Sequence, residues 1–142
     1  MSGEKETLKT TAWLERFEKS KEQIAWKTEE LNRLKAVATA VGSGRMEGRS
    51  AGAAGSRAEE MAERIADGTR ELEKLREKQA GTYVEILDAV GKMTDVRERQ
   101  LLILCYLDGQ SLPEAANRMK VSYSLAYELK KRAFTHLKDI LN

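Results

Sequence analysis

Few side chains in this chain of 142 residues have the types and spacing needed for catalysis or metal binding. Cys105 and His136 are the only cysteine and the only histidine. One of each cannot complete a four-ligand zinc site, and neither belongs to a plausible catalytic group of nucleophile, base and orienting residue. We therefore predict no catalytic residue, no metal site and no cofactor. Because Cys105 lies in the apolar run 101–107, we expect a buried, unreactive thiol.

The distribution of charge points to a different chemistry, the binding of nucleic acid. The whole chain has a net charge of only +2, but residues 118–138 hold six Lys or Arg against one acid, Glu128. Residues 58–93 have the opposite balance, with nine acids against six bases. A basic block at one end of an otherwise balanced chain is a candidate surface for nucleic-acid phosphates. Charge alone also fits a solvated helix face.

The composition predicts the elements that must position this basic block. One proline, 6% aromatic residues and 34% charged residues favour long helices over a β-fold. The first residues have no apolar core typical of a signal peptide, and the longest uncharged apolar run, 101–107, is far shorter than the ~20 residues that span a bilayer. We expect an all-α protein in the cytoplasm, without a membrane partner.

Residues 1–93 are predicted to form a long antiparallel helical hairpin. Apolar residues recur at heptad-like spacing in 8–41 and again in 58–93, which indicates two amphipathic helices that pack on each other. Gly81 predicts a bend or break in the second helix. Two helices alone bury little surface, so we expect a homo-oligomer formed through residues 8–93. The stripe positions are Trp13, Phe17, Ile24, Leu31, Leu34, Ala38 and Val41, then Ala58, Met61, Ile65, Leu72, Leu75, Ile86, Ala89 and Met93.

The two stripes are separated by a glycine-rich segment, residues 42–57. It contains five of the ten glycines and three arginines, Arg45, Arg49 and Arg57. Such a composition predicts a flexible loop, and a loop of this length is either disordered or a binding element. We favour disorder.

Residues 94–142 carry the signals of three short helices. Thr94 or Asp95 can cap the first, with Glu98 placed to complete a capping box, and the helix should end at Asp108-Gly109. Ser111 and Glu114 form a second capping box before residues 112–119. A turn at Lys120-Val121 leads to a third helix capped by Ser122, with a core stripe of Ala126, Leu129, Ala133, Leu137 and Ile140. This layout is typical of a helix-turn-helix.

The third helix supplies the candidate DNA-binding residues. Side chains at its start would reach base edges in the major groove, and the cations around it would contact phosphates. A helical bundle with a solvated basic face is the simpler alternative. The candidates are Ser122, Tyr123, Ser124, Tyr127, Glu128, Lys131, Lys120, Lys130 and Arg132.

The segment RERQLLILCYLDGQSLPEAANRMKVSYSLAYELKKRAFTHL resembles region four of bacterial sigma factors. Together with WLERFEKSKEQIAWKTEELNRLKAVAT near the start, it is similar to phage- and prophage-associated regulators of the RinA and ArpU type. The resemblance implies a late transcriptional regulator in a bacterial host cell, with Tyr123, Ser124, Tyr127, Glu128 and Lys131 as recognition residues. It also implies bacterial RNA polymerase as a candidate partner. The chain lacks the aromatic-rich domain that a complete sigma factor uses to melt promoters.

The preferred interpretation is a sequence-specific regulator that binds double-stranded DNA. Two alternatives remain open. One is a small terminase-like subunit for DNA packaging, because such subunits also combine a helix-turn-helix with helical oligomerisation segments. The other is an interaction module in which the three helices bind a protein of a host complex.

Overall fold

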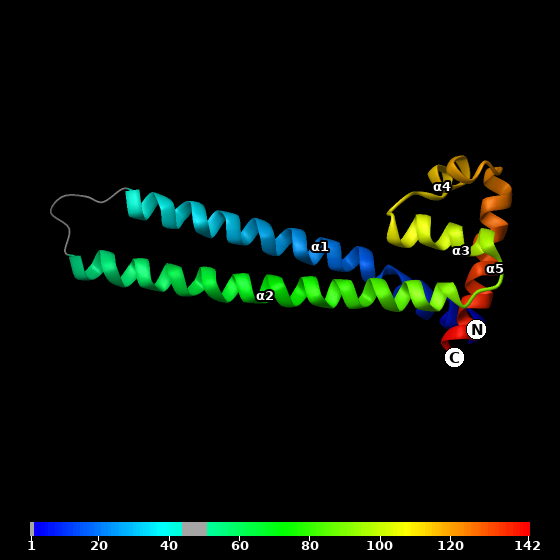
Figure 1. Cartoon of the computed structure of the whole chain (residues 1–142), viewed down its shortest axis with the longest axis horizontal. Coiled ribbons are helices and arrows are strands. Elements are labelled where there is room, and N and C mark those ends of the chain that lie inside the picture. Colours follow the sequence, from blue (N-terminus) through cyan, green and yellow to red (C-terminus); the bar gives the residue numbers. More distant parts are fainter. Residues whose placement is uncertain (1, 44–50) are drawn as a thin grey trace. The chain divides into compact units, whose positions relative to one another are not determined.

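The computed structural model describes residues 2–43 and 51–142, and these form helices without a β-strand (Figure 1). Two long helices come first, α1 (Ser2–Ser43) and α2 (Ala51–Gly91). Four shorter elements follow: α3 (Val96–Leu102), the π-helical turn η1 (Ile103–Leu107), α4 (Leu112–Met119) and α5 (Tyr123–Leu141). The prediction of an all-α protein with two long N-terminal helices is confirmed.

The chain divides into two compact units, and the long helices contribute to both. One unit, here called the head, comprises Met1–Ser20 and Gln79–Asn142. The other, here called the hairpin, is Lys21–Lys78. The predicted boundary between residues 93 and 94 therefore lies inside the head, because the start of α1 and the end of α2 pack with the C-terminal elements.

The larger cluster of the head core joins α1, α2, α3, η1 and α5. Its residues with the lowest exposure, all at or below 1%, are Leu14, Ile86, Val90, Leu102, Ala133 and Leu137. Trp13, Phe17 and Tyr106 pack against the same cluster. The other cluster lies between α3, η1, α4 and the start of α5, and consists of Leu101, Leu104, Ala115, Ala116, Ala126 and Leu129.

In the hairpin, α1 and α2 run antiparallel (Figure 1). Lys27 of α1 pairs with Glu71 of α2 at 2.5 Å, and the side chain of Leu31 lies against Gly68. Of the predicted stripe residues, Leu31 and Leu72 are buried and Ile24, Leu34, Ala38, Met61, Ile65 and Leu75 are half-buried. Val41 and Ala58 are exposed, so the prediction that they belong to the core is wrong. A pair of helices has no third element to cover these positions.

Two predictions for α2 are also wrong. The segment 51–57 belongs to the helix rather than to a loop, and 42–43 belong to α1. The alanines at 51, 53 and 54 favour a helix enough to outweigh the nearby glycines. The rest of the predicted loop, 44–50, lies outside the described residues. The helix also continues without a break through Gly81, because a single glycine weakens a helix by only about 1 kcal/mol and Thr82 and Ile86 are held in the head.

None of the helices in 2–43 and 51–142 combines the length and the apolar character needed to cross a membrane.

Candidate nucleic-acid interface

The local geometry of α4 and α5 follows from capping interactions close in sequence. The Ser111 hydroxyl accepts a hydrogen bond from Glu114 N, and the Glu114 carboxylate accepts one from Ser111 N, both at 3.3 Å. This is the predicted capping box, and α4 has the predicted bounds. Pro113 occupies the first turn of α4, where its missing N–H removes no helical bond.

The connection between α4 and α5 is tight and has a fixed conformation. Lys120 ends α4 in the left-handed region, with φ 60° and ψ 42°. The backbone N–H of Val121 donates to Ala116 O at 3.0 Å, which completes the end of α4. Ser122 then caps α5, since its hydroxyl accepts a hydrogen bond from Leu125 N at 3.1 Å. The predicted turn and cap are both confirmed, and together they fix the direction in which α5 leaves α4.

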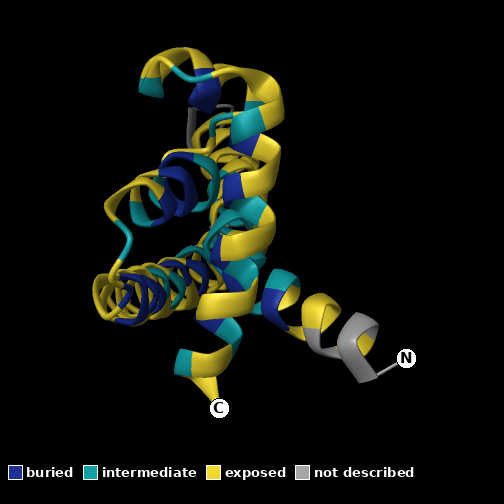
Figure 2. Cartoon of the chain, turned by 90° about the vertical axis from the view of Figure 1, so that its right-hand side faces the viewer, coloured by how far each residue is buried: buried dark blue, intermediate teal, exposed yellow. Residues whose placement is uncertain are grey.

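Small residues allow α4 and α5 to approach closely. Ala115 and Ala126 are both fully buried, and Ala116 is 4% exposed. Leu101, Leu104 and Leu129 fill the rest of this contact. The predicted core stripe of α5 is confirmed for Ala126, Leu129, Ala133 and Leu137, whereas Ile140 is half-buried. Figure 2 shows the buried and exposed positions on opposite sides of α5.

The outer face of α5 brings together most of the candidate residues. Tyr123 is 56% exposed and Tyr127 is 46% exposed, which is unusual for side chains of this size on a helix with a well-packed inner face. They lie one turn apart, so their rings share one side of the helix. Exposed polar and charged side chains surround them: Ser122, Ser124, Glu128, Lys131 and Arg132 on α5 and its cap, and Lys120 in the preceding turn.

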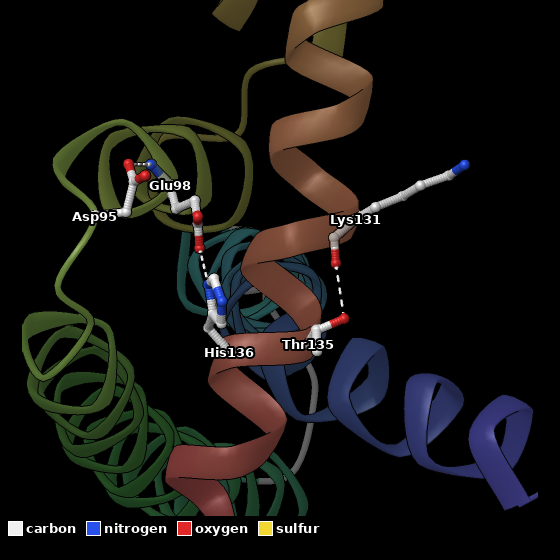
Figure 3. A network of polar contacts seen from close by, with 5 residues as sticks. All are labelled: Asp95, Glu98, Lys131, Thr135 and His136. Carbon is white, nitrogen blue, oxygen red and sulfur yellow. Dashed lines mark hydrogen bonds and ion pairs between the residues drawn. The ribbon is translucent and has the colours of Figure 1, made fainter.

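Lys131 is an exposed cation of this face. Its ammonium is 4.7 Å from the centroid of the Tyr127 ring and 3.9 Å from Glu128 Oε1. Both contacts are on the surface, where such pairs contribute about 1 kcal/mol or less. The side chain points away from the head, while its backbone carbonyl accepts a hydrogen bond from Thr135 at 3.2 Å (Figure 3). An incoming anion can therefore reach this ammonium without disrupting the fold.

Lys130 differs from the other cations of the candidate set. It is half-buried, and its ammonium is 6.0 Å from the centroid of Tyr106 and 5.7 Å from that of Phe134. The ammonium thus lies near two aromatic rings that pack against the larger core cluster. We expect Lys130 to contribute less to an anion site than Lys120, Lys131 and Arg132, which are exposed.

A buried acid links α3 to α5 on another side of the helix. The side chain of Glu98 is 2% exposed, and its Oε1 lies 2.5 Å from Nδ1 of His136 (Figure 3). Asp95 caps α3 as predicted, because its carboxylate accepts a hydrogen bond from Glu98 N at 3.1 Å. The carboxylate of Glu98, however, turns to His136 rather than back to the cap. The predicted capping box at 95–98 is therefore wrong in its second half.

Sequence reasoning missed the pairing of Glu98 with His136, which are 38 positions apart. A signal for the burial of Glu98 does exist. It precedes Leu101 and Leu102 by three and four positions, so it lies on the same helix face as two fully packed leucines. An acid on such a face needs a polar partner inside the fold.

Cys105, which was expected to be buried, is half-buried, and so is its neighbour Tyr106. Burial raises the pKa of the Cys105 thiol, which favours the protonated form. Burial also raises the pKa of Tyr106 to about 12. Within the described part of the chain, no cluster of three or more His, Cys, Asp or Glu side chains could hold a metal ion.

No protein-family model, curated protein or solved structure matches this chain. The geometry of α4 and α5 is therefore the main guide to function.

Proposed function

We propose that this protein is a sequence-specific regulator of transcription that binds double-stranded DNA through a helix-turn-helix formed by α4 and α5. One observation carries the proposal: a short capped helix is joined by a left-handed turn at Lys120 to a longer helix with exposed tyrosines and cations. A helix-turn-helix needs these features, because the turn sets the angle at which the second helix enters the major groove.

In this proposal the start of α5 reads base edges. Tyr123, Ser124 and Tyr127 project from the first turns of the helix, and the hydroxyl groups can donate or accept hydrogen bonds with bases. Lys120, Lys131 and Arg132 contact phosphates on either side and fix the position of the helix on the duplex. Glu128 limits nonspecific binding, because its charge repels the DNA backbone.

The resemblance of residues 97–137 to sigma region four supports a role in transcription and makes bacterial RNA polymerase a candidate partner. The similarity to regulators of the RinA and ArpU type, which includes the N-terminal segment, supports a phage or prophage origin. A packaging subunit would use the same DNA-binding helix within a ring. A protein-interaction module would use the exposed tyrosines without DNA. Both are outcomes of the experiment below.

The test is a salt series on the intact protein, with one duplex that contains a site mapped in host cells and one scrambled duplex. Three exposed cations per chain predict a slope of about −2.7 for the logarithm of affinity against the logarithm of salt concentration. Lys131→Ala should weaken binding to both duplexes and reduce the magnitude of that slope by about one. The matched control is Lys78→Ala, which removes an equally charged, exposed lysine from α2 and should change neither value.

A variant of Tyr127 separates recognition of the DNA sequence from nonspecific electrostatic binding. Tyr127→Ala should reduce the preference for the mapped site about tenfold, the equivalent of one good base contact, while the salt slope stays unchanged. Equal losses on both duplexes for Tyr127→Ala and Lys131→Ala would show that α5 holds DNA without reading it. Absence of wild-type binding to either duplex at low salt would overturn the proposal and favour a protein partner. A closed ring of eight or more chains on DNA would favour packaging.

A further inference from the structure

His136 is the only histidine of the chain, and its ring lies against a buried acid. Nδ1 of the ring is 2.5 Å from Oε1 of Glu98, whose side chain is 2% exposed (Figure 3). The side chain of His136 is itself 54% exposed. The ring therefore contacts the interior of the head through Nδ1 and remains accessible to an external partner, for which Nε2 is the remaining polar atom.

The contact with Glu98 determines which nitrogen of the neutral ring carries the proton. An ionised carboxylate only accepts hydrogen bonds, so Nδ1 must donate and Nε2 is left as an acceptor. When the ring gains a second proton, Nε2 becomes a donor as well and the ring becomes a cation. Protonation therefore converts Nε2 from an atom that repels an anion into one that binds it.

The charge of this pair changes in the same direction. A neutral ring leaves the pair of Glu98 and His136 with one negative charge, whereas a protonated ring leaves it with none. Asp95 at the start of α3 and Asp139 on α5 add negative charge nearby, and Arg132 on α5 adds positive charge. A phosphate therefore meets less repulsion at this place when His136 is protonated.

The position of His136 on α5 connects it to the candidate DNA interface. It follows Arg132 by one helical turn, so the two side chains are neighbours. The pKa of Asp95 is lowered mainly by the hydrogen bond from Glu98 N and in part by the charge of Arg132, so Arg132 also lies on the side of α5 that faces α3. In the homeodomain form of the helix-turn-helix, the C-terminal end of the third helix contacts the DNA backbone. His136 is thus placed to extend the phosphate contacts of Arg132 toward the end of α5.

We propose that His136 is a further phosphate contact of α5 whose strength is set by pH, with Glu98 as the positioning residue that leaves Nε2 for the phosphate. The inference rests on the proposed function, because the phosphate belongs to bound DNA. Histidine is the only side chain that ordinarily gains or loses its proton between about pH 5 and pH 8, and this chain has one. The affinity for DNA should therefore increase as the pH falls through this range.

The experiment measures the affinity of the full chain for the mapped and the scrambled duplex at about pH 8 and about pH 5.5, near the two ends of the range in which histidine titrates. The wild type should bind both duplexes about fivefold more tightly at the lower pH, the change expected for one exposed ion pair. The salt slope should also be larger in magnitude by about 0.9 at the lower pH, because one more phosphate is neutralised. A purely structural role of the pair would not change this slope.

Two substitutions hold the charge at position 136 constant. His136→Gln stays neutral, so at both pH values it should bind as the wild type does at the higher pH. His136→Arg stays charged, so at both pH values it should bind as the wild type does at the lower pH. The matched control is Lys131→Ala, which should weaken binding at both pH values but keep the ratio of about fivefold between them. Circular dichroism and denaturant unfolding at both pH values verify that each variant is folded.

Nitrogen-15 NMR of the single imidazole tests the role of Glu98 in the free protein. At the higher pH the wild-type ring should carry its proton on Nδ1. Glu98→Leu removes the acceptor and replaces the buried acid by an apolar side chain of similar size, a change that cores often tolerate. In this variant the proton should move to Nε2, the position that an unpaired neutral histidine prefers.

Three outcomes would count against the inference. DNA binding of equal strength at the two pH values, or a pH ratio that His136→Gln retains, would overturn it and leave the proposed function intact. A wild-type ring with its proton on Nε2 at the higher pH would also overturn it, because Nε2 would then be a donor whether or not the ring is charged. Absence of binding to either duplex at both pH values would overturn the inference together with the proposed function.

Discussion

The head and the hairpin are built from the same two long helices but bury their apolar residues very differently. In the head, several elements converge, and Leu14, Leu101 and Leu137 are fully buried. In the hairpin, two helices meet along one seam, where Leu31 and Leu72 are buried. An amphipathic helix needs neighbours on more than one side to bury its whole apolar stripe. The number of packed elements, rather than the quality of the stripe, therefore decides how much core forms.

The largest effect expected from this difference is the loss of stability when a buried leucine is replaced by alanine. Leu101→Ala should lower the free energy of unfolding of the head by about 3–5 kcal/mol, because the site is surrounded by Leu104, Ala115 and Leu129 and cannot collapse around the cavity. Leu72→Ala in the hairpin should lose only about 2 kcal/mol, since that leucine is 8% exposed and water can enter the space.

Residue-resolved amide hydrogen exchange during denaturant titration measures both losses, because it reports separately on 21–78 and on the head. The conservative controls are Leu101→Met and Leu72→Met, which should lose less than about 1.5 kcal/mol each. If Leu72→Ala destabilised its unit as much as Leu101→Ala does, the hairpin would have a tighter core than its exposed side chains indicate.

The second comparison uses two glycines of α2, one in each unit. A Cβ on Gly81 in the head would meet nothing within 4 Å, whereas a Cβ on Gly68 in the hairpin would lie 2.5 Å from Leu31 Cδ2. Gly81→Ala should therefore stabilise the protein by about 1 kcal/mol through helix propensity. Gly68→Ala gains the same helix propensity but forces Leu31 aside. Overpacking costs about 1–3 kcal/mol, so the free energy of unfolding should decrease.

Thermal melts of both variants test whether the two substitutions change stability in opposite directions. Equal stabilisation by the two substitutions would mean that Leu31 moves aside freely and that the helices need no glycine at their contact.

The features predicted correctly from sequence depend on residues close together in the chain. Ser111, Glu114 and Ser122 indicate helix starts because a cap is an interaction over three positions. The tight turn at Lys120-Val121 follows from the short distance between the end of α4 and the cap at Ser122, whereas the left-handed conformation of Lys120 was not predicted. The bounds of α4 and the inner face of α5 are therefore predictable from the amino-acid sequence alone.

The features that were missed depend on packing between distant segments. Leu14 and Val90 are among the best-buried residues of the head, yet neither belongs to the predicted heptad stripes. Their burial comes from the elements that converge there, which a period of seven in one helix does not describe. The contact of Glu98 with His136 was missed for the same reason. In the opposite direction, Val41 fits the stripe but is 37% exposed, because no third element covers that part of the hairpin.

The smallest effect expected is a difference in how the two units respond to pH. Hydrogen bonding to Glu98 N lowers the pKa of Asp95 in the head below its ordinary value of 3.8. This contribution to stability is present above pH 3.8 and is lost as the pH falls through the folded-state pKa. In the hairpin, the hydrogen bond to Glu71 raises the pKa of Lys27 above 10.5. That contribution is present below pH 10.5 and is lost as the pH rises through the folded-state pKa.

Acid should therefore weaken the cap of α3 in the head while the Lys27 ammonium of the hairpin stays charged. Asp95→Asn is the matched variant, because asparagine is an equally good helix cap but does not titrate. Between about pH 4 and pH 2, the denaturant concentration at the unfolding midpoint should decrease less in this variant than in the wild type. Linkage confines the difference to this range. Hydrogen exchange in α3 should show the same difference between variant and wild type. In 21–78 the variant and the wild type should exchange alike at each pH. An acid response of α3 identical in the two proteins would mean that the Asp95 carboxylate caps the helix no better when charged than when neutral.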